Sequence, residues 1–317
     1  ASDFKQVVEL DIDKIGEYKS LKWGNYQAGV AYFLQESGTP LVGCDLLYDC
    51  TVPFGSGLSS SAAIEVSTAV ALSEYAGVKY DKVIFVGDSR MVELSDLVAN
   101  DNIQYIAKRG IGVNWLKGSG YPKLQKAVKK TKGRKAVVFF IGINDTYHIK
   151  EYITALNSYY KPLKEENCDV YYLSLTPTTS VGKTPSKSTE SVRVFNAKMK
   201  SGLKKGIRYL DIFSYFRWGI NSVDGVHYTD SSYGSIHRYF LRRLKKYGTV
   251  KKGKYNWEYK DGSWYCYNRK GKLYKSRFLP LMNGTCYVNS KGKKLANRTF
   301  TVKKKTYHAD RFGIVKK

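Results

Sequence analysis

The chain is poor in cysteine, proline, methionine and histidine. Its 317 residues include 5 Cys, 7 Pro, 3 Met and 4 His. The cysteines are odd in number and show no Cys-x-x-Cys spacing; they are Cys44, Cys50, Cys168, Cys266 and Cys286. Neither a zinc site nor a disulfide framework is therefore indicated.

Long apolar runs are also missing. No stretch of about 18 apolar residues occurs, so no membrane-spanning helix is expected. The chain shows no signal-peptide pattern, which a mature or trimmed chain would also lack. The hydrophobic fraction of 43% is sufficient for a globular core, and the length allows one large domain or two to three smaller ones. The 27 tyrosines suggest an aromatic-rich surface or repeat structure.

The formal charge of +26 is unevenly distributed. Residues 1–80 carry 5 Lys or Arg and 10 Asp or Glu, a net charge of −5. Residues 81–247 carry 29 and 14, a net charge of +15, and residues 248–317 carry 19 and 3, a net charge of +16. The change of sign near residue 80 indicates pieces of different origin. A strongly basic surface attracts polyanions, and charge alone does not distinguish nucleic acid from an anionic cell-wall polymer or from a merely soluble lysine-rich surface.

The first segment, residues 1–80, contains a turn rich in glycine and serine. A β-rich stretch is expected before this turn, and an Ala-rich helix after it from about Ser60 to Tyr75. Such a turn at the start of a helix presents backbone N–H groups to an anion. The candidate phosphate-binding residues are Gly55, Gly57, Ser59, Ser60 and Ser61.

This segment resembles the galactokinase branch of the GHMP sugar kinases. The matching residues are Trp23, Asn25, Tyr26, Gly29, Gly43, Asp45, Pro53, the PFGSGLSSSAA loop and Glu65. The family's sugar-binding signature, the segment with its catalytic Asp and its glycine-rich C-terminal motif are missing. The resemblance therefore implies an α+β kinase fragment, and a sugar (galactose) kinase is the least favoured function for the whole chain.

The second segment, residues 81–247, alternates short apolar runs with helical periodicity. The apolar runs lie at 83–86, 103–107, 136–141, 170–175 and 207–212, and helical patterns cover 147–166 and 191–205. This alternation predicts an α/β domain with a parallel sheet covered on both faces. Ligands bind such sheets at the carboxyl ends of the strands. The motifs GDSR at 87–90 and GIND at 142–145 both follow strands and should lie on that edge.

The same segment offers every group that acyl transfer requires. Ser89 is a hydroxyl nucleophile in a turn after a strand. Asp224 precedes His227 by three residues, which lets the carboxylate hold the imidazole in the tautomer whose Nε2 accepts a proton. The candidate oxyanion donors are the backbone N–H of Ser89, a backbone N–H of Gly110 or Gly112, and the side-chain amide of Asn144.

Four blocks in this segment resemble the SGNH (GDSL-like) hydrolases: GDSR at 87–90, RGIG at 109–112, GIND at 142–145 and DGVH at 224–227. The resemblance implies a flavodoxin-like three-layer fold, with Ser89 as nucleophile, His227 as general base and Asp224 as its orienting acid. It also implies that no metal and no cofactor is required. The second block is weak because no Ser or Thr follows either glycine, so Gly110 and Gly112 remain alternatives.

The third segment, residues 248–317, repeats an Asn/Asp-x-x-Gly turn at 268–271, 289–292 and 310–313, with a period of 21. This pattern predicts stacked β-hairpins. The segment resembles the choline- or glucan-binding repeats of Gram-positive surface proteins, although the doubled Gly-Trp pattern of choline binders is incomplete. The resemblance implies carbohydrate or wall binding by Trp264, Tyr265, Tyr287 and Tyr307. The alternative is a basic β appendage that packs on the hydrolase.

The sequence as a whole predicts an SGNH-type serine esterase that works through an acyl-serine intermediate. The expected substrate is an O-acyl group on a cell-wall or extracellular polysaccharide. An anionic wall polymer is the expected second partner, and nucleic acid is not favoured. The alternative function is a non-catalytic surface-binding protein. The repeats favour an extracellular or cell-surface location, whereas a native kinase fragment would favour the cytoplasm.

Overall fold

A computed structural model describes residues 7–37, 41, 44–49, 60–75, 79–179, 188–245 and 247–316. The chain divides into two compact units. The first consists of Ala1–Lys79 and Arg242–Thr249, and the second of Tyr80–Leu241 and Val250–Lys317. The short strands β1 (Lys79–Tyr80) and β7 (Thr249–Val250) lie at the division. The first boundary coincides with the change in the sign of the net charge along the sequence.

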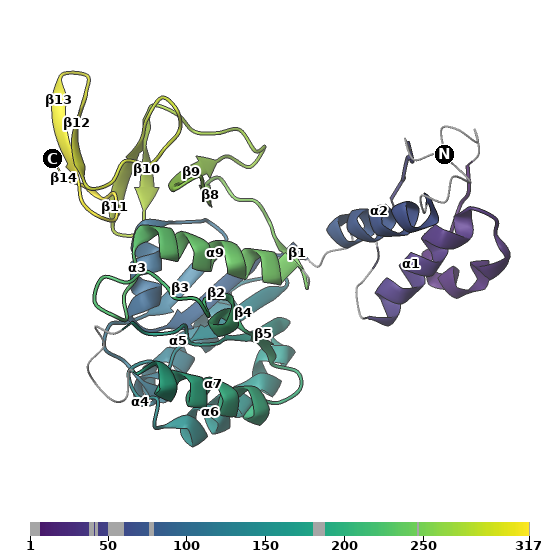
Figure 1. The fold of residues 1–317 in the computed structure, drawn as a ribbon, viewed down its shortest axis with the longest axis horizontal. Coiled ribbons are helices and arrows are strands. Elements are labelled where there is room, and N and C mark those ends of the chain that lie inside the picture. The colour runs from purple at the N-terminus through teal and green to yellow at the C-terminus, as the bar shows by residue number, and fades with distance from the viewer. Residues whose placement is uncertain are drawn as a thin grey trace. The chain divides into compact units, whose positions relative to one another are not determined.

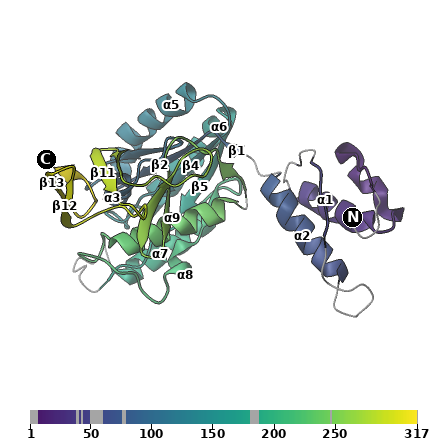
Figure 2. The same ribbon diagram turned by 90° about the horizontal axis from the view of Figure 1, so that it is seen from above.

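The first unit is built from the 3-10 helix η1 (Ile12–Ser20) and the helices α1 (Gly24–Glu36) and α2 (Ser60–Tyr75). The bounds of α2 are those predicted for the Ala-rich helix. Helices α1 and α2 lie side by side (Figures 1 and 2). The unit has a small apolar core of its own, formed by Ile15, Ala28, Ala31 and Leu72.

The β-rich stretch expected before the serine-rich turn is not a strand in the described residues. Residues 44–49 belong to no helix or strand, and no strand lies among the described residues from 41 to 75. Gly55, Gly57 and Ser59 lie outside the described residues. Ser60 and Ser61 begin α2, where the Ser61 hydroxyl donates to Tyr26 Oη at 3.1 Å.

The second unit contains a five-stranded parallel sheet. Its strands are β2 (Lys82–Gly87), β3 (Ile103–Ala107), β4 (Lys135–Phe140), β5 (Cys168–Leu173) and β6 (Arg208–Leu210). All five predicted strands are confirmed. Their spatial order is β3-β2-β4-β5-β6, and every neighbouring pair is parallel. This is the flavodoxin-like order, in which the first strand of the domain lies between the second and the third.

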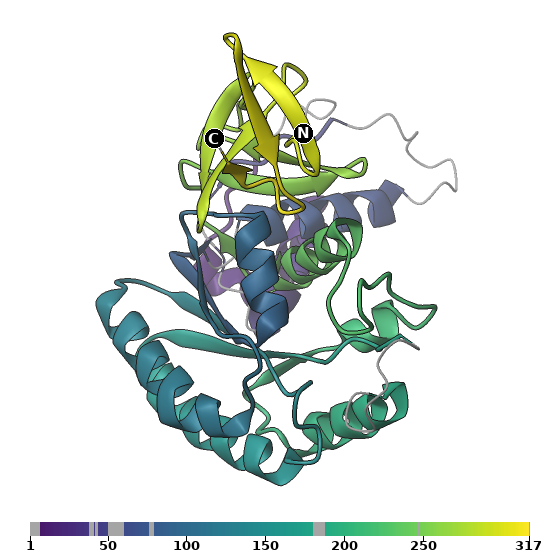
Figure 3. The ribbon, with the colours of Figure 1, turned by 90° about the vertical axis from the view of Figure 1, so that its left-hand side faces the viewer.

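Helices cover both faces of this sheet (Figure 3). Helices α3 (Ser89–Leu97) and α9 (Asp230–Lys245) lie on one face, and α5 (Tyr121–Lys130), α6 (Ile149–Glu165) and α7 (Thr189–Gly202) on the other. Phe85 of β2 packs on Phe240 of α9, whereas Phe139 of β4 packs on Tyr159 of α6. The short helices α4 (Val113–Trp115) and α8 (Ile212–Tyr215) and the π-helical turn η2 (Leu116–Gly120) belong to the connections. The predicted three-layer architecture is confirmed.

The C-terminal residues form antiparallel hairpins. The pairs are β8 (Asn256–Lys260) with β9 (Ser263–Tyr267), β10 (Arg277–Leu281) with β11 (Gly284–Val288), and β12 (Arg298–Val302) with β13 (Lys305–Ala309), the last joined by β14 (Val315–Lys316). Figure 3 shows these hairpins stacked above α3. The predicted module of β-hairpin repeats is confirmed; it is called the hairpin module below.

The predicted turns recur with the same hydrogen bonds in each repeat. Asn268 Oδ1 accepts the backbone N–H of Lys270 and Lys272, both at 2.9 Å. Asn289 and Asp310 accept from the corresponding residues of their own turns. The turn glycines have positive φ angles, which an L side chain tolerates poorly: Gly271 at 79°, Gly292 at 79° and Gly313 at 76°. The turn that recurs every 21 residues in the sequence therefore has the same backbone conformation and hydrogen bonds in each repeat.

His237 lies where α9 packs on the first hairpin. Its ring stands edge-on to Trp264, with 5.4 Å between the ring centroids. The residue is 2% exposed, and its Nε2 has no hydrogen-bond partner among the described residues. Burial lowers the pKa of His237 to about 4.

We expect the free energy of unfolding to decrease as the pH falls from about 6.5 towards 4. In this window the unfolded chain binds a proton at residue 237 that the folded chain does not bind, so acid favours unfolding by up to about 3 kcal/mol. Urea denaturation at about pH 5 and about pH 7.5 measures the difference. The difference in the free energy of unfolding between the two pH values should shrink in His237→Phe. It should persist in the control His308→Phe, because His308 is an exposed histidine of the hairpin module. Equal pH dependence in wild type and His237→Phe would contradict the prediction.

Candidate active site

Ser89 is the first residue of α3 and directly follows the turn after β2. Asp88 caps the helix, since its carboxylate accepts the backbone N–H of Arg90 at 3.2 Å. Gly87 has no room for a side chain: an added Cβ would lie 2.5 Å from Met91 Cγ and 2.6 Å from Phe140 O. The sequence Gly-Asp-Ser therefore allows the strand to turn into the helix close to β4 and places Ser89 at the carboxyl edge of the sheet.

A buried ion pair fixes this turn. Arg90 Nε and Nη2 donate to the two carboxylate oxygens of Asp88 at 2.8 and 2.7 Å, and both side chains are fully buried. The guanidinium also stacks 3.9 Å from the centre of the Phe140 ring. Burial acts to lower the pKa of Arg90, but the charge of Asp88 outweighs it and the pKa is raised. This pair could not be predicted from the sequence, because a resemblance to family motifs does not disclose what an arginine contacts.

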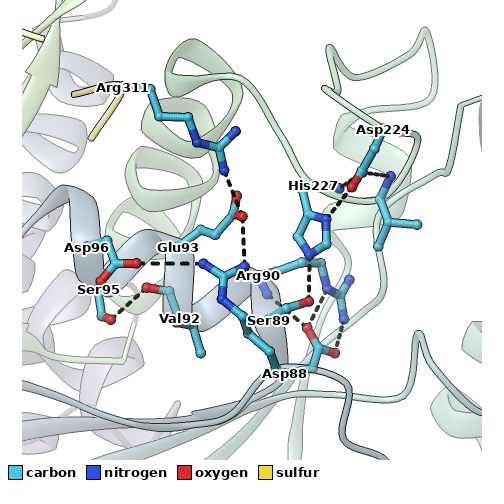
Figure 4. Close-up of polar contacts among 12 residues, drawn as sticks. Asp88, Ser89, Arg90, Val92, Glu93, Ser95, Asp96, Asp224, His227 and Arg311 are labelled. Carbon is cyan, nitrogen blue, oxygen red and sulfur yellow. Dashed lines mark hydrogen bonds and ion pairs between the residues drawn. The ribbon is translucent and has the colours of Figure 1, made fainter. Parts of the chain in front are cut away.

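Ser89, His227 and Asp224 form a continuous chain of hydrogen bonds (Figure 4). Ser89 Oγ lies 2.7 Å from His227 Nε2, and His227 Nδ1 lies 2.6 Å from Asp224 Oδ2. Asp224 and His227 come from the connection between β6 and α9. His227 is 138 residues from Ser89 in the sequence. This geometry allows the imidazole to remove the serine proton while the carboxylate orients the ring.

Asp224 is held as a carboxylate by its surroundings. Partial burial acts to raise its pKa, but hydrogen bonds from the His227 side chain and from the backbone N–H groups of His227 and Val226 outweigh it, and the pKa falls to about 2. Those N–H groups donate to Asp224 Oδ1 at 2.8 and 3.0 Å. The Asp224 side chain is 54% exposed and that of His227 23%. The pair therefore lies near the surface.

Asn144 lies beside the second glycine block. Its Nδ2 donates to the carbonyl of Ile111 at 2.8 Å, which leaves the second hydrogen of the amide for another acceptor. Ile111 lies between the two candidate glycines. Gly110 adopts a φ of 68°, and apart from itself and its two chain neighbours no residue has an atom within 4 Å of where its Cβ would be. The structure thus brings Asn144 to the block that contains both glycines.

Asp145 locks the Gly112 backbone in place. A Cβ on Gly112 would lie 2.0 Å from Asp145 Oδ2, so only glycine fits there. The same oxygen accepts the N–H of Val113 at 2.8 Å, and Asp145 Oδ1 accepts from Tyr152 Oη at 2.6 Å. This role of Asp145 was not predicted from the sequence. Its position next to Asn144 in GIND was the available signal.

The aromatic residues predicted to bind a wall polymer differ in accessibility. Trp264 is 2% exposed and packs on His237 and Tyr259, so its prediction as a surface-binding residue is wrong. Its large apolar ring supplies the core between the first hairpin and α9. Tyr265, Tyr287 and Tyr307 are only partly buried.

Within the described ranges, no group of three or more His, Cys, Asp or Glu residues is arranged to hold a metal ion. In the same part of the chain, no helix combines the length and the apolar character that crossing a bilayer requires.

Comparison with known sequences concerns the N-terminal part. Residues 25–97 match the family described as GHMP kinases N terminal domain. Galactokinase from Thermosipho africanus is 36% identical over 85 residues, which cover 27% of this chain and 24% of that protein. Galactokinase from Chloroflexus aggregans is 48% identical over 64 residues, or 20% and 16% of the two chains. The chain thus spans about a quarter or less of the length of these relatives.

Solved structures similar to the rest of the chain include hydrolases and a choline-binding domain. A lipase/acylhydrolase from Enterococcus faecalis has 14% identity and a TM-score of 0.39, covering 52% of this chain and 95% of that one. A variant of an acetyl-xylooligosaccharide esterase from Geobacillus has 15% identity and a TM-score of 0.38, covering 53% and 95%. A choline-binding domain from Streptococcus pneumoniae has 28% identity and a TM-score of 0.18, covering 19% and 80%.

Proposed function

We propose that the domain of residues 81–247 hydrolyses an ester through an acyl-serine intermediate. The observation that supports this is the hydrogen-bond chain from Ser89 Oγ through His227 to Asp224. His227 Nε2 takes the serine proton as Ser89 Oγ attacks the ester carbonyl, and returns it to the alcohol that leaves. Water, deprotonated by the same nitrogen, then releases the acid and restores the serine.

The developing oxyanion needs donors that are already in place. We assign this role to the backbone N–H of Ser89, to the second Nδ2 hydrogen of Asn144 and to the backbone N–H of Gly112. Gly112 is chosen over Gly110 because Asp145 fixes it beside Asn144, whereas the position of a Cβ on Gly110 is open on all sides. Each such donor contributes about 10²- to 10³-fold to turnover in comparable sites.

Reaction with a serine-directed fluorophosphonate tests the mechanism. The intact chain should lose turnover of p-nitrophenyl acetate, and mass spectrometry should locate one adduct on Ser89. The Ser89→Ala chain should gain no adduct. If the folded wild type shows neither turnover nor an adduct, the acyl-serine mechanism is wrong and a non-catalytic surface-binding protein becomes the better description.

The proposed substrate is an O-acyl group on a cell-wall or extracellular polysaccharide. The surface position of Asp224 and His227 favours an ester carried by a polymer, because such an ester need not enter a deep pocket. The hairpin module supplies partly exposed tyrosines and a net charge of +16 over residues 248–317, which suit an anionic glycopolymer. An extracellular or cell-surface location belongs to this proposal.

Acetate release from O-acetylated polysaccharide tests the substrate. Wild type should release acetate in a Ser89-dependent manner. If the chain hydrolyses aryl or lipid esters but releases no acetate from acetylated glycans, the proposed esterase activity stands and the proposed polysaccharide substrate is wrong.

A further inference from the structure

Helix α3 carries more than Ser89. Eight of its nine residues are buried, and two of these are acidic: Glu93 and Asp96. Ser89, Glu93 and Asp96 are spaced at i, i+4 and i+7, so they share one side of the helix. Buried carboxylates require partners, and here those partners come both from the sheet domain and from the hairpin module.

Glu93 connects three separate parts of the chain. Its side chain is 3% exposed, and Oε1 lies 3.1 Å from Arg109 Nη1 and 2.8 Å from Arg311 Nη2. Oε2 accepts the hydroxyl of Tyr233 of α9 at 3.0 Å. Arg109 belongs to the second glycine block. Arg311, whose side chain meets that of Glu93 in Figure 4, belongs to the third turn of the hairpin module. The carboxylate one turn after Ser89 thus joins the oxyanion block to the hairpins.

The hairpin module holds the remainder of α3 as well. Asn283, in the turn between β10 and β11, donates to Asp96 Oδ1. Lys294 is 8% exposed, and its Nζ donates to the carbonyls of Leu97 at 2.5 Å and Phe312 at 2.8 Å. Leu97 is the last residue of α3, where a positive charge is favourable to the helix dipole. The module therefore contacts α3 at its middle and at its C-terminal end.

We infer that the hairpin module is a positioning part of the catalytic site. Asn283, Lys294 and Arg311, called the helix clamp here, hold α3, and α3 is joined to the Arg109 block through the carboxylate of Glu93. Through these contacts the clamp holds the helix that begins at Ser89. This inference rests on the proposed function, because it concerns the placement of the proposed nucleophile.

Charge and exposure make Arg311 the residue to change. Its side chain is 44% exposed, and without it Glu93 still keeps Arg109 and Tyr233 as partners, so the urea midpoint is expected to change little. Misplacement of a nucleophile by a fraction of an ångström, in contrast, lowers turnover steeply. A loss of kcat without a matching loss of stability therefore separates positioning from folding.

The experiment compares Arg311→Gln, Arg311→Lys and Asn283→Ala in the full chain. Arg269→Gln is the matched control, because Arg269 occupies the same place in the first turn as Arg311 does in the third and is exposed. The readouts are kcat and KM for p-nitrophenyl acetate, the rate of Ser89 modification by the fluorophosphonate, and the urea midpoint.

Arg311→Gln should lower kcat and the modification rate by about tenfold, with KM and the urea midpoint nearly unchanged. Asn283→Ala should act in the same direction, Arg311→Lys should recover part of the loss, and Arg269→Gln should match wild type. If Arg311→Gln and Asn283→Ala stay within about twofold of an active wild type, the clamp is wrong while the esterase stands. A folded wild type without turnover or adduct rejects the proposed function and the clamp with it.

Discussion

Replacement of Ser89 by alanine is expected to lower kcat for an aryl ester by about 10⁴-fold or more. Its hydroxyl is the group that lies 2.7 Å from His227 Nε2 at the carboxyl edge of the sheet. Without it, the imidazole can only activate water, and the oxyanion donors alone give slow turnover. Steady-state hydrolysis of p-nitrophenyl acetate, with the enzyme concentration fixed by active-site titration of wild type, measures the loss.

Ser95→Ala provides the control on the same helix. Ser95 is also buried in α3, but its hydroxyl donates to the carbonyl of Val92 at 2.7 Å. Its removal should leave kcat within about twofold of wild type at a stability cost of about 1 kcal/mol. Ser89→Ala should retain the wild-type urea midpoint, since Asp88 rather than Ser89 caps the helix. Residual activity near the wild-type level in Ser89→Ala would show that another group carries the reaction.

The sheet and the repeats could be predicted because their signals are local. Apolar runs between helical patterns are sufficient to locate strands, and the first strand at 83–86 differs from β2 only at its ends. The turns at 268–271, 289–292 and 310–313 depend on an Asn or Asp and a glycine within four residues. Helix α2 from Ser60 to Tyr75 likewise follows from a contiguous pattern.

The site could be predicted only as far as its motifs reach. Ser89 and Asn144 closely follow strands, and the topology of a parallel sheet brings such residues to one edge. Asp224 and His227 lie beyond α8 and were predicted only from their spacing and the family resemblance. The reciprocal pair of Arg90 and Asp88 and the locking role of Asp145 depend on side-chain directions. The periodicity of apolar residues in a sequence does not predict those directions.

The helix clamp could not be predicted for a different reason. Glu93 and Arg311 are 218 residues apart, and a single sequence holds no signal for a contact at that distance. The burial of Trp264 has the same origin, because it depends on the docking of the first hairpin against His237. The resemblance to wall-binding repeats implied carbohydrate or wall binding, and the contacts of this module with α3 agree with the alternative, an appendage that packs on the sheet domain.

The other large effect is expected from Asp224→Asn, which should lower kcat by about 10⁴-fold with little change in structure. The carboxylate accepts three N–H groups: two from the backbone on Oδ1 and His227 Nδ1 on Oδ2. An amide has only one oxygen. Because two backbone donors outweigh one, the oxygen should face Val226 and His227, and the NH₂ group should face the imidazole. His227 Nδ1 must then accept, its proton moves to Nε2, and Nε2 can no longer take the proton of Ser89.

This mechanism separates Asp224→Asn from a general loss of structure. Asp211→Asn is the matched control, because the Asp211 carboxylate also accepts a backbone N–H, that of Ser214 at 3.0 Å, at the start of α8. It should retain wild-type kcat. Asp224→Asn should keep the wild-type KM and urea midpoint while modification of Ser89 by the fluorophosphonate slows in parallel with kcat. The pKa of about 2 for Asp224 adds a second constraint, because loss of wild-type activity between about pH 7 and pH 5 cannot then come from protonation of that carboxylate. If the fluorophosphonate modifies Ser89 of the Asp224→Asn chain at the wild-type rate, the carboxylate does not set the tautomer of His227.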